Sequence, residues 1–566
     1  MFVGEGADSI EDILSGFVRA HPATVTVRDG AVVRRHRAPS GQVAVVLGGG
    51  GGHYPGFAGW VGAGMADAAV SGQIFSSPSE AQIYRAARSV ENGAGVLLAS
   101  LNYSGDRIHF GAAASRLRAE GVPVEEVVIA DDIASRTSRS AADGRGIAGA
   151  LFVAKVLGAA ADEGRSLAEV ARVGRRAAAR SVTLGAATSG CTLPGDREPL
   201  FTVPAGKLAI GLGIHGEPGI EMQRQGTPQE LADLLVATLL DHAPESQQEK
   251  QRVALLVNSL GGCSHEELFI LYAKIHDRLE SHGHVVLSPV VGEYLTSLDM
   301  VGASLSVMFL DAELESLWRA PAHTPSFFRE VELEQVQRSV AVERAPAADL
   351  TDASLASREI ASRVCGAIER AAEEVRRHEE RLGQLDRVGG DGDHGRGMVR
   401  GLSAAHDAAL AAAESGAGLR SVLAAAGAAW SDKAGGTSGA LWGAALAAFA
   451  TAVDDQRAPT VADIADGLRR ALDAVGDLGG AHPGDKTMVD AIAPFVEVFT
   501  NATGAALASR WEQAVSAAEE AAERTADHVA AKGRARLHRQ NTLGTPDPGA
   551  MSFALVTRAV AASFDE

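Results

Sequence analysis

The chain has 566 residues, of which 46% are hydrophobic and 22% are charged, and its formal net charge is −19. A chain of this length is too long for one hydrophobic core, so we expect two to four domains. The negative charge argues against binding to nucleic acid or to an anionic membrane, because both require a basic surface. A phosphorylated ligand is compatible with it, since such a ligand needs only a local cluster of donors or a metal ion.

The cysteine content and the N-terminal sequence indicate the cellular compartment in which the protein is expected. Cys191, Cys263 and Cys365 are widely spaced and follow no metal-ligand pattern, which is typical of a reducing compartment without disulfides. No apolar run reaches the length of a membrane span, and the acidic N-terminus does not resemble a signal peptide. We therefore expect a cytoplasmic protein that binds neither a membrane nor nucleic acid.

From about residue 40 to 320, short β-branched runs alternate with helical patterns. The apolar runs that end in Gly, Asn or Asp are 43–47, 96–100, 127–129 and 253–257. Continuous apolar strands of this kind predict parallel or mixed sheets covered by helices on both faces. In such sheets, ligands bind at the loops beyond the carboxyl ends of the strands. This half is predicted to be α/β.

The first apolar run leads into five glycines, Gly48–Gly52, followed by His53. The spacing does not fit a dinucleotide fingerprint, because the last glycine of Gly-x-Gly-x-x-Gly would fall on His53, Tyr54 or Pro55. Asp106 follows the next apolar run and a glycine, so it can reach the same crevice. His53 and Asp106 are therefore candidates for a general base acting on a hydroxyl. The alternative is a rim histidine and a turn-capping aspartate.

A later loop, residues 211–219, presents the single histidine His215 among glycines and a proline. Glycine allows positive φ and close approach of a ligand, and proline fixes the exit direction of the chain. A histidine held in this way can offer a neutral ring nitrogen to an electrophile such as a substrate carbonyl. An ordinary hydrogen-bonding loop histidine is the alternative.

After residues 324–327 the chain becomes charged and irregular, and we place a linker at 331–352 between an α/β half, 1–330, and a second half, 353–566. Nearly everything in the second half is alanine-rich and helix-forming. The predicted helices are 357–381, 404–414, 419–430, 441–452, 461–474, 510–531 and 552–563. We expect an all-α bundle that carries one functional rim.

The second half contains three carboxylates within eight residues, Asp386, Asp391 and Asp393, interrupted by glycines. The glycines disfavour a continuing helix, so the loop can fold back and point its carboxylates at one spot. Carboxylates this close repel one another unless a cation joins them, and hard oxygen ligands favour Mg²⁺ or Ca²⁺. The spacing does not match an EF-hand. A solvated acidic loop is the alternative.

Further glycine-rich loops accompany the carboxylates. Residues 434–439 read Ala-Gly-Gly-Thr-Ser-Gly and precede a predicted helix, so their backbone N–H groups suit a phosphate. Residues 479–488 and 547–549 add turns, although each alone is more often a helix connection. Binding of Mg·ATP requires at least a loop that binds the metal ion and backbone N–H groups that bind the phosphates. Neither a P-loop nor the protein-kinase motif set occurs.

Together these motifs resemble the single-chain, ATP-dependent dihydroxyacetone kinase family over almost the whole chain. The matching segments are 48–53, 70–79, 102–106, 144–149, 211–219, 294–298, 390–395, 435–439, 484–488 and 547–550. The resemblance implies a ketose-binding α/β half with two subdomains and a nucleotide-binding, all-α helical barrel. It also implies a homodimer in which the barrel covers the ketose site.

The resemblance further implies roles for residues of the first half. His215 matches a histidine that binds the ketose carbonyl covalently as a hemiaminal, which selects ketoses over glycerol. His53 and Asp106 match the residues that bind and deprotonate the acceptor hydroxyl. The implied substrate-binding residues are Gly50, Gly51, Gly52, His53, Asp106 and His215.

In the second half, Asp386, Asp391 and Asp393 match the ligands of two Mg²⁺ ions that bridge the phosphates of ATP. The residues that match nucleotide contacts are Asp393, His394, Gly395, Arg396, Thr437, Ser438, Gly479, Thr487, Met488, Asp547, Pro548 and Gly549. Catalysis is then expected to be phosphoryl transfer by positioning and charge neutralisation, without a phosphoenzyme.

Two departures from the family pattern bear on the substrate. The family commonly reads Gly-Ser-Gly-His-Glu-Pro where this chain reads Gly50-Gly-Gly-His-Tyr-Pro55, and it commonly has Lys where this chain has Leu101. We expect a less polar pocket, and our hypothesis for the acceptor is four-carbon erythrulose, with dihydroxyacetone as the alternative. Three other interpretations stay open: a phosphotransferase-fed kinase, a non-catalytic ketose sensor or co-regulator, and a side activity that cyclises FAD.

Overall fold

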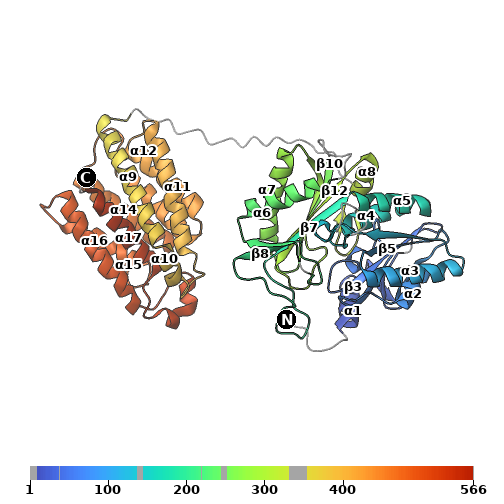
Figure 1. The fold of residues 1–566 in the computed structure, drawn as a ribbon. Coiled ribbons are helices and arrows are strands. Elements are labelled where there is room, and N and C mark those ends of the chain that lie inside the picture. The colour runs from blue at the N-terminus through green and yellow to red at the C-terminus, as the bar shows by residue number, and fades with distance from the viewer. Residues whose placement is uncertain are drawn as a thin grey trace. The chain divides into compact units, whose positions relative to one another are not determined.

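The computed structural model describes residues 9–36, 38–136, 144–217, 219–243, 252–330 and 353–564. It divides into two compact units, Met1–Arg338 and Ser339–Glu566 (Figure 1). Where described, the first unit contains strands and helices, and the second contains helices without strands. The predicted fold class, an α/β half followed by an all-α half, is confirmed. The linker expected at 331–352 lies outside the described residues.

The first unit holds two six-stranded sheets. The first has the strand order β1-β2-β4-β3-β5-β6, in which β3, β4, β5 and β6 run parallel. Its strands are β1 (Val25–Arg28), β2 (Ala31–Arg34), β3 (Ala44–Gly51), β4 (Ala68–Ile74), β5 (Val96–Leu101) and β6 (Val124–Ile129). The apolar runs predicted at 43–47, 96–100 and 127–129 thus fall in β3, β5 and β6, strands that helices cover on both faces.

Helices cover both faces of this sheet because side chains alternate along each strand. In β3, Ala44 and Val46 belong to the apolar cluster with α2 and α3, whereas Val45 and Leu47 belong to the cluster with α4 and α5. The helices of this part are α1 (Ser9–Ala20), α2 (Glu80–Val90), α3 (Ser104–Ala119), α4 (Ala150–Asp162) and α5 (Leu167–Ala179).

The second sheet has the order β11-β10-β12-β7-β8-β9 and is mixed, since only β10 and β11 pair in parallel. Val253, Leu255 and Val257 of β10 pack against α6 and α7, while Ala254 and Leu256 face the cluster around α4. The elements are β7 (Ser181–Ala187), β8 (Lys207–Ile210), β9 (Glu221–Arg224), α6 (Pro228–Asp241), β10 (Arg252–Ser259), α7 (His265–Ser281), β11 (Val285–Gly292), β12 (Gly302–Phe309), α8 (Ala312–Arg319), and the short pair β13 (Ala322–His323) and β14 (Phe328–Arg329).

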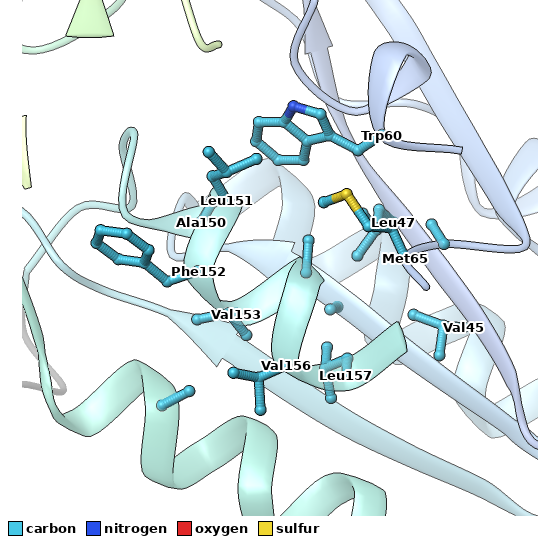
Figure 2. Packing of buried hydrophobic residues seen from close by; sticks show 14 of the residues in the cluster. Val45, Leu47, Trp60, Met65, Ala150, Leu151, Phe152, Val153, Val156 and Leu157 are labelled. Atoms are coloured by element: carbon cyan, nitrogen blue, oxygen red, sulfur yellow. The ribbon is translucent and has the colours of Figure 1, made fainter. Parts of the chain in front are cut away.

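Helix α4 packs against both sheets and is buried along almost its whole length. Phe152, Val153 and Val156 point in different directions and all meet apolar neighbours (Figure 2). A helix that is apolar all round has to be buried. At Gly158 the backbone of Met65 approaches so closely that a Cβ would lie 2.2 Å from the Met65 Cα. The helix therefore joins the two sheets into one core, which matters because the candidate site takes residues from both.

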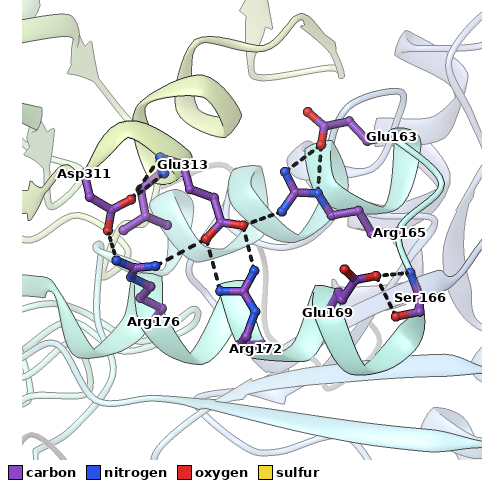
Figure 3. A network of polar contacts seen from close by, with 9 residues as sticks. Glu163, Arg165, Ser166, Glu169, Arg172, Arg176, Asp311 and Glu313 are labelled. Atoms are coloured by element: carbon purple, nitrogen blue, oxygen red, sulfur yellow. Dashed lines mark hydrogen bonds and ion pairs between the residues drawn. The ribbon is translucent and has the colours of Figure 1, made fainter.

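A surface network also ties α5 to α8 (Figure 3). Glu313 lies 2.6 Å from Arg165, 2.7 Å from Arg172 and 3.3 Å from Arg176, and Arg176 in turn lies 2.7 Å from Asp311. The hydrogen bonds from Arg172 and Arg165 lower the pKa of Glu313 to about 2, so it stays ionised. These side chains are substantially exposed, so each pair contributes little by itself.

The helical unit forms a closed ring. Neighbouring helices pack in the order α9-α11-α12-α13-α14-α15-α16-α17, and α17 closes on α9. The helices are α9 (Leu355–Arg377), α10 (Glu379–Asp386), α11 (His394–Glu414), α12 (Leu419–Ala434), α13 (Gly436–Ala450), α14 (Val461–Gly479), α15 (Val489–Asn501), α16 (Leu507–Arg524) and α17 (Pro548–Ala561). The expected helical barrel is therefore present, with α10 packed against α11 and α17.

Several helix boundaries differ from the expectation. The helix predicted at 357–381 ends at Arg377, and a separate helix, α10, starts at Glu379. The helix predicted at 404–414 begins ten residues earlier, at His394. Helix α15 was not predicted, because Pro494 lies inside it and proline normally ends a helix.

Candidate active site

The candidate ketose site of the first unit starts at the loops after β3 and β5. Strand β3 runs on through Gly51 instead of ending at residue 47, so residues 48–53, called here the substrate loop, comprise the end of β3 and the two residues after it. Because β3 and β5 are parallel neighbours, the substrate loop and residues 102–106, which lead into α3, lie at the same edge of the sheet. Gly52 has φ +89°, a conformation that a residue with a side chain rarely adopts, and it turns the chain so that His53 points inward. His53 is 2% exposed.

His53 and His215 meet in this site although they follow strands of different sheets. Their Nε2 atoms lie 2.9 Å apart. The ring of Phe75 stacks on His53, with centroids 5.3 Å apart, and Tyr103 meets His215 edge-on at 4.7 Å. The structure thus brings together two of the three residues that we predicted to be catalytic.

The hydrogen bonds of the two rings determine their protonation. His53 Nδ1 lies 2.8 Å from the carbonyl oxygen of Thr296, and His215 Nδ1 lies 3.1 Å from a carboxylate oxygen of Glu217. Both partners only accept, so each Nδ1 carries a hydrogen and a neutral ring leaves a lone pair on Nε2. Two lone pairs 2.9 Å apart repel each other, so the contact requires one proton between the two Nε2 atoms.

The surroundings of this contact shift the pKa values of His53 and Glu217. Burial, followed by the positive charge of His215, lowers the pKa of His53 to about 3. Burial alone would raise the pKa of Glu217, but the hydrogen bond from His215 and its positive charge outweigh burial and lower it to about 2. His53 is therefore neutral, and Glu217 is an ionised carboxylate beside the ring of His215.

Asp106, the third predicted catalytic residue, lies in the first turn of α3 and is 4% exposed. Its Oδ1 atom is buried and has no hydrogen-bond partner in the described part of the chain. Burial raises its pKa to about 6, although a hydrogen bond from Ser77 and the charges of His215 and His109 act in the opposite direction. A buried carboxylate with one unused oxygen and a raised pKa suits a general base.

The loop that carries His215 is held by residues that sequence reasoning did not assign. Arg145 pairs with the fully buried Asp132 at 2.7 Å and donates to the carbonyl of Gly211 at 3.1 Å. Ser297 donates to the carbonyl of Ile214 at 2.6 Å. The acidic pair that follows β6 was the sequence signal for this anchor, because it stands at the carboxyl end of a parallel strand.

A cavity of about 300 Å³ lies beside the substrate loop. It is lined by Gly50–Tyr54 and by the apolar side chains of α1, among them Ile13 and Phe17. Tyr54, one departure from the family pattern, packs edge-on against Phe17 at 5.6 Å, and Leu101, the other, is 2% exposed. The wall of the cavity is largely apolar and includes Tyr54, whereas Leu101, Asp106 and His215 are not among its lining residues.

In the helical unit, residues 386–393, called here the acid loop, bring the three predicted metal ligands together. One carboxylate oxygen from each of Asp386, Asp391 and Asp393 lies within 4.8 Å of the others. Asp386 holds the loop by accepting the backbone N–H groups of Gly392 at 2.8 Å and of Asp393 at 3.1 Å. A cluster of oxygen donors of this size fits Mg²⁺.

The acid loop opens into a cavity of about 410 Å³. Residues 435–438, called here the glycine loop, and residues 547–549, called here the Asp547 turn, also line it. The helix predicted to begin at 441 begins at Gly436, so the glycine loop includes the first turn of α13, and the Asp547 turn includes the first residues of α17. Of the predicted nucleotide contacts, those that line it are Asp393, His394, Thr437, Ser438, Gly479, Thr487, Met488, Asp547, Pro548 and Gly549. The two others do not: a Cβ on Gly395 would meet the carbonyl of Glu379 at 2.1 Å, and Arg396 is exposed.

The cavity contains further residues that the sequence analysis did not single out. Leu441, Val475 and Leu478 form an apolar part suited to a base, and Lys486 and Lys532 add positive charge. Lys486 Nζ donates to the carbonyl of Thr542 at 2.6 Å and to that of His528 at 3.1 Å, so it also holds the following segment. The motif at residues 484–488 was the available signal for Lys486.

Two known domain families match the chain. The Dak1 domain matches residues 15–326, and the DAK2 domain matches residues 388–562. The chain belongs to the dihydroxyacetone kinase family. An L-erythrulose 1-kinase of Mycolicibacterium smegmatis is 46% identical over 98% of this chain and 97% of that protein, and a D-erythrulose kinase of the same organism is 46% identical over 97% and 96%.

Among solved structures of the family, the dihydroxyacetone kinase of C. freundii in complex with AMP-PNP and Mg²⁺ is similar to this chain. It is 30% identical, with a TM-score of 0.59, over 100% of this chain and 99% of that one. The assignment to the dihydroxyacetone kinase family that the motifs indicated is confirmed. In the part of the chain that the structure describes, no helix is long and apolar enough to cross a membrane.

Proposed function

We propose that the protein is an ATP-dependent kinase that phosphorylates the terminal hydroxyl of a short-chain ketose held as a hemiaminal on His215. The observation that carries this proposal is the 2.9 Å contact between the Nε2 atoms of His53 and His215. A site that holds a nucleophile and a proton at the same point is equipped to add to a carbonyl group.

Ketose capture follows from this arrangement. The Nε2 atom of His215 forms a bond to the carbonyl carbon, and the proton shared with His53 moves to the carbonyl oxygen, which becomes a hydroxyl. The positive charge stays in the ring of His215, where the carboxylate of Glu217 stabilises it 3.1 Å from Nδ1. A polyol has no carbonyl to accept this bond, so the site selects ketoses over glycerol.

Phosphorylation then requires removal of the proton from the terminal hydroxyl. We assign this step to Asp106, and the assignment is supported by its buried Oδ1, which has no hydrogen-bond partner among the described residues. General-base catalysis by a positioned carboxylate contributes about 10²- to 10⁴-fold to the rate. His53 is left neutral after capture, and its hydrogen bond to the carbonyl of Thr296 fixes the orientation of its own ring.

The helical unit supplies the nucleotide. Asp386, Asp391 and Asp393 would hold Mg²⁺, two ions by family resemblance, which when bound neutralises the phosphate charges. The glycine loop directs backbone N–H groups at the start of α13 toward a phosphate. We further propose that the protein acts as a homodimer in the cytoplasm.

For the acceptor we propose erythrulose. Two erythrulose kinases are 46% identical to the chain, and the apolar positions Tyr54 and Leu101 favour a ketose other than dihydroxyacetone. Because one of these relatives is named for the L form and the other for the D form, identity does not decide the stereochemistry.

The test is a coupled ADP-release assay with dihydroxyacetone, D-erythrulose, L-erythrulose and glyceraldehyde. We expect the largest kcat/KM with one erythrulose enantiomer and strict dependence on added ATP. A clear preference for dihydroxyacetone contradicts the choice of erythrulose. Turnover sustained by phosphoenolpyruvate and phosphotransferase proteins, without added ATP, contradicts the choice of ATP. Binding of a ketose without any turnover would favour a sensor.

A further inference from the structure

His394 occupies a central position among the loops of the nucleotide cavity. It is the first residue of α11, directly after the acid loop, and only 9% of its surface is exposed. Its Nε2 lies 3.0 Å from Ser552 Oγ of α17, and its Nδ1 lies 3.3 Å from Ser438 Oγ of the glycine loop. Both ring nitrogens are therefore used by other parts of the protein.

The direction of these hydrogen bonds follows from Ser552. Its hydroxyl donates to the carbonyl of Gly549 in the Asp547 turn at 2.9 Å, so its oxygen accepts from His394 Nε2. The carbonyl of Pro548 is a further acceptor for the ring. A neutral ring with hydrogen on Nε2 has a lone pair on Nδ1, and the Ser438 hydroxyl therefore donates to Nδ1.

The result is a directed chain of hydrogen bonds from Ser438 through His394 and Ser552 to Gly549. It connects the first residues of α11, α13 and α17, which adjoin or include the acid loop, the glycine loop and the Asp547 turn; these segments lie far apart in the sequence and all line the same cavity. Because the Ser438 hydroxyl donates its single hydrogen to His394, it cannot donate a hydrogen bond to a phosphate oxygen. In this arrangement the donors that face a phosphate are the backbone N–H groups of the glycine loop.

We propose that His394 is a positioning residue that aligns these three loops for the triphosphate, rather than a ligand of the phosphates. The inference rests on the proposed nucleotide-binding function of this unit. It deepens that function by assigning the side chain of His394 a role in holding the loops, whereas the family resemblance implies direct contact with the nucleotide.

The test measures the affinity of the full-length protein for Mg·AMP-PNP by calorimetry. Loss of the bridge in His394→Ala is expected to raise the dissociation constant about tenfold, the effect of one net hydrogen bond. Ser552→Ala is expected to act in the same direction. The double variant is expected to bind no more weakly than His394→Ala alone, because both changes break the same chain.

Conservative variants of His394 distinguish a role in positioning the loops from a role in stabilising the fold. His394→Gln places a donor near Nε2 and can still reach Ser552, while His394→Asn places an acceptor near Nδ1 and can still reach Ser438. Each is expected to recover part of the lost affinity. His406→Asn, in the same helix at a partly exposed position, is the matched control and should bind like the wild type.

Three outcomes overturn the inference. The first is an unchanged affinity in His394→Ala, even if its melting temperature falls. The second is full additivity of the two alanine variants. The third is a lack of any rescue by both Gln and Asn. A wild-type protein that forms the ketose adduct on His215 but does not bind Mg·AMP-PNP contradicts the proposed function itself, and the inference with it.

Discussion

Glu217 holds His215 at two points: one carboxylate oxygen accepts the backbone N–H of His215 at 2.9 Å, and the other lies 3.1 Å from Nδ1 of its ring. The same short loop therefore positions the imidazole. In the proposed adduct it also places a carboxylate beside the positive charge that the ring of His215 carries.

Glu217→Gln is expected to weaken ketose capture at neutral pH by about tenfold or more, because a charge-assisted hydrogen bond is lost. In the adduct the ring of His215 carries a positive charge that the carboxylate no longer neutralises, so capture should stay weaker than in the wild type from pH 7.5 to 6. Intact-mass measurement of the adduct across this range checks the prediction. A variant that captures ketose like the wild type at every pH would show that the carboxylate does not act in capture.

His215→Ala is expected to abolish the ketose adduct and leave binding of Mg·AMP-PNP unchanged. Asp391→Ala is expected to do the reverse, because it removes one of three carboxylates that lie within 4.8 Å of one another. Intact-mass measurement of the adduct and calorimetry of Mg·AMP-PNP binding, both performed on both variants, check the two expectations. Loss of both functions in either variant, with an unchanged melting temperature, would contradict the assignment of the two steps to separate residues.

Asp106→Asn is expected to form the adduct but to lower kcat by at least about a hundredfold, since the general base is lost. In the wild type, kcat should decline as the pH falls through about 6, because the raised pKa of Asp106 makes the carboxylate accept a proton there. A pH–rate profile with saturating ketose and ATP measures this. A profile that stays flat between pH 5 and 7.5 would remove Asp106 from the proton transfer.

Lys155 lies in the core of the first unit, fully buried, with Nζ donating to the carbonyl of Leu317 at 2.9 Å. Burial, followed by the charge of Arg329, lowers its pKa to about 7. In the unfolded chain the lysine stays protonated up to about pH 10, so folding releases a proton between these values. The unfolded state then binds more protons, and the free energy of unfolding should rise as the pH increases from 7 to 9.

Lys155→Met should remove this pH dependence and increase the stability of the first unit at pH 7. The upper limit is about 4 kcal/mol, from roughly three pKa units, less the lost hydrogen bond to Leu317. Denaturant titrations at pH 7 and 9 on both proteins measure the difference. Equal slopes with pH for wild type and variant would show that Lys155 is charged in the folded protein.

The sequence predicted local features well and helix limits less well. The acid loop could be anticipated because its carboxylates and glycines stand within eight residues, and the apolar runs of β3 and β5 read directly as buried strands. Helix α15 was not predicted because a proline inside a segment normally argues against a helix. In the structure, the packing of Phe495 and Phe499 against Trp511 stabilises the helix around Pro494. Glu217 and Arg145 were passed over because ion pairs on loops carry no periodic signal.

By itself the sequence determined which chemical groups the protein contains and in which segments they lie, because glycine spacing and apolar runs are local properties. It did not determine that His53 and His215 face each other through their Nε2 atoms, nor that Ser438, His394 and Ser552 form one chain of hydrogen bonds. These contacts join residues more than 40 positions apart, and only the packing of sheets and helices sets their distances. The protonation of each ring depends on its partners, so it too was decided by the tertiary structure.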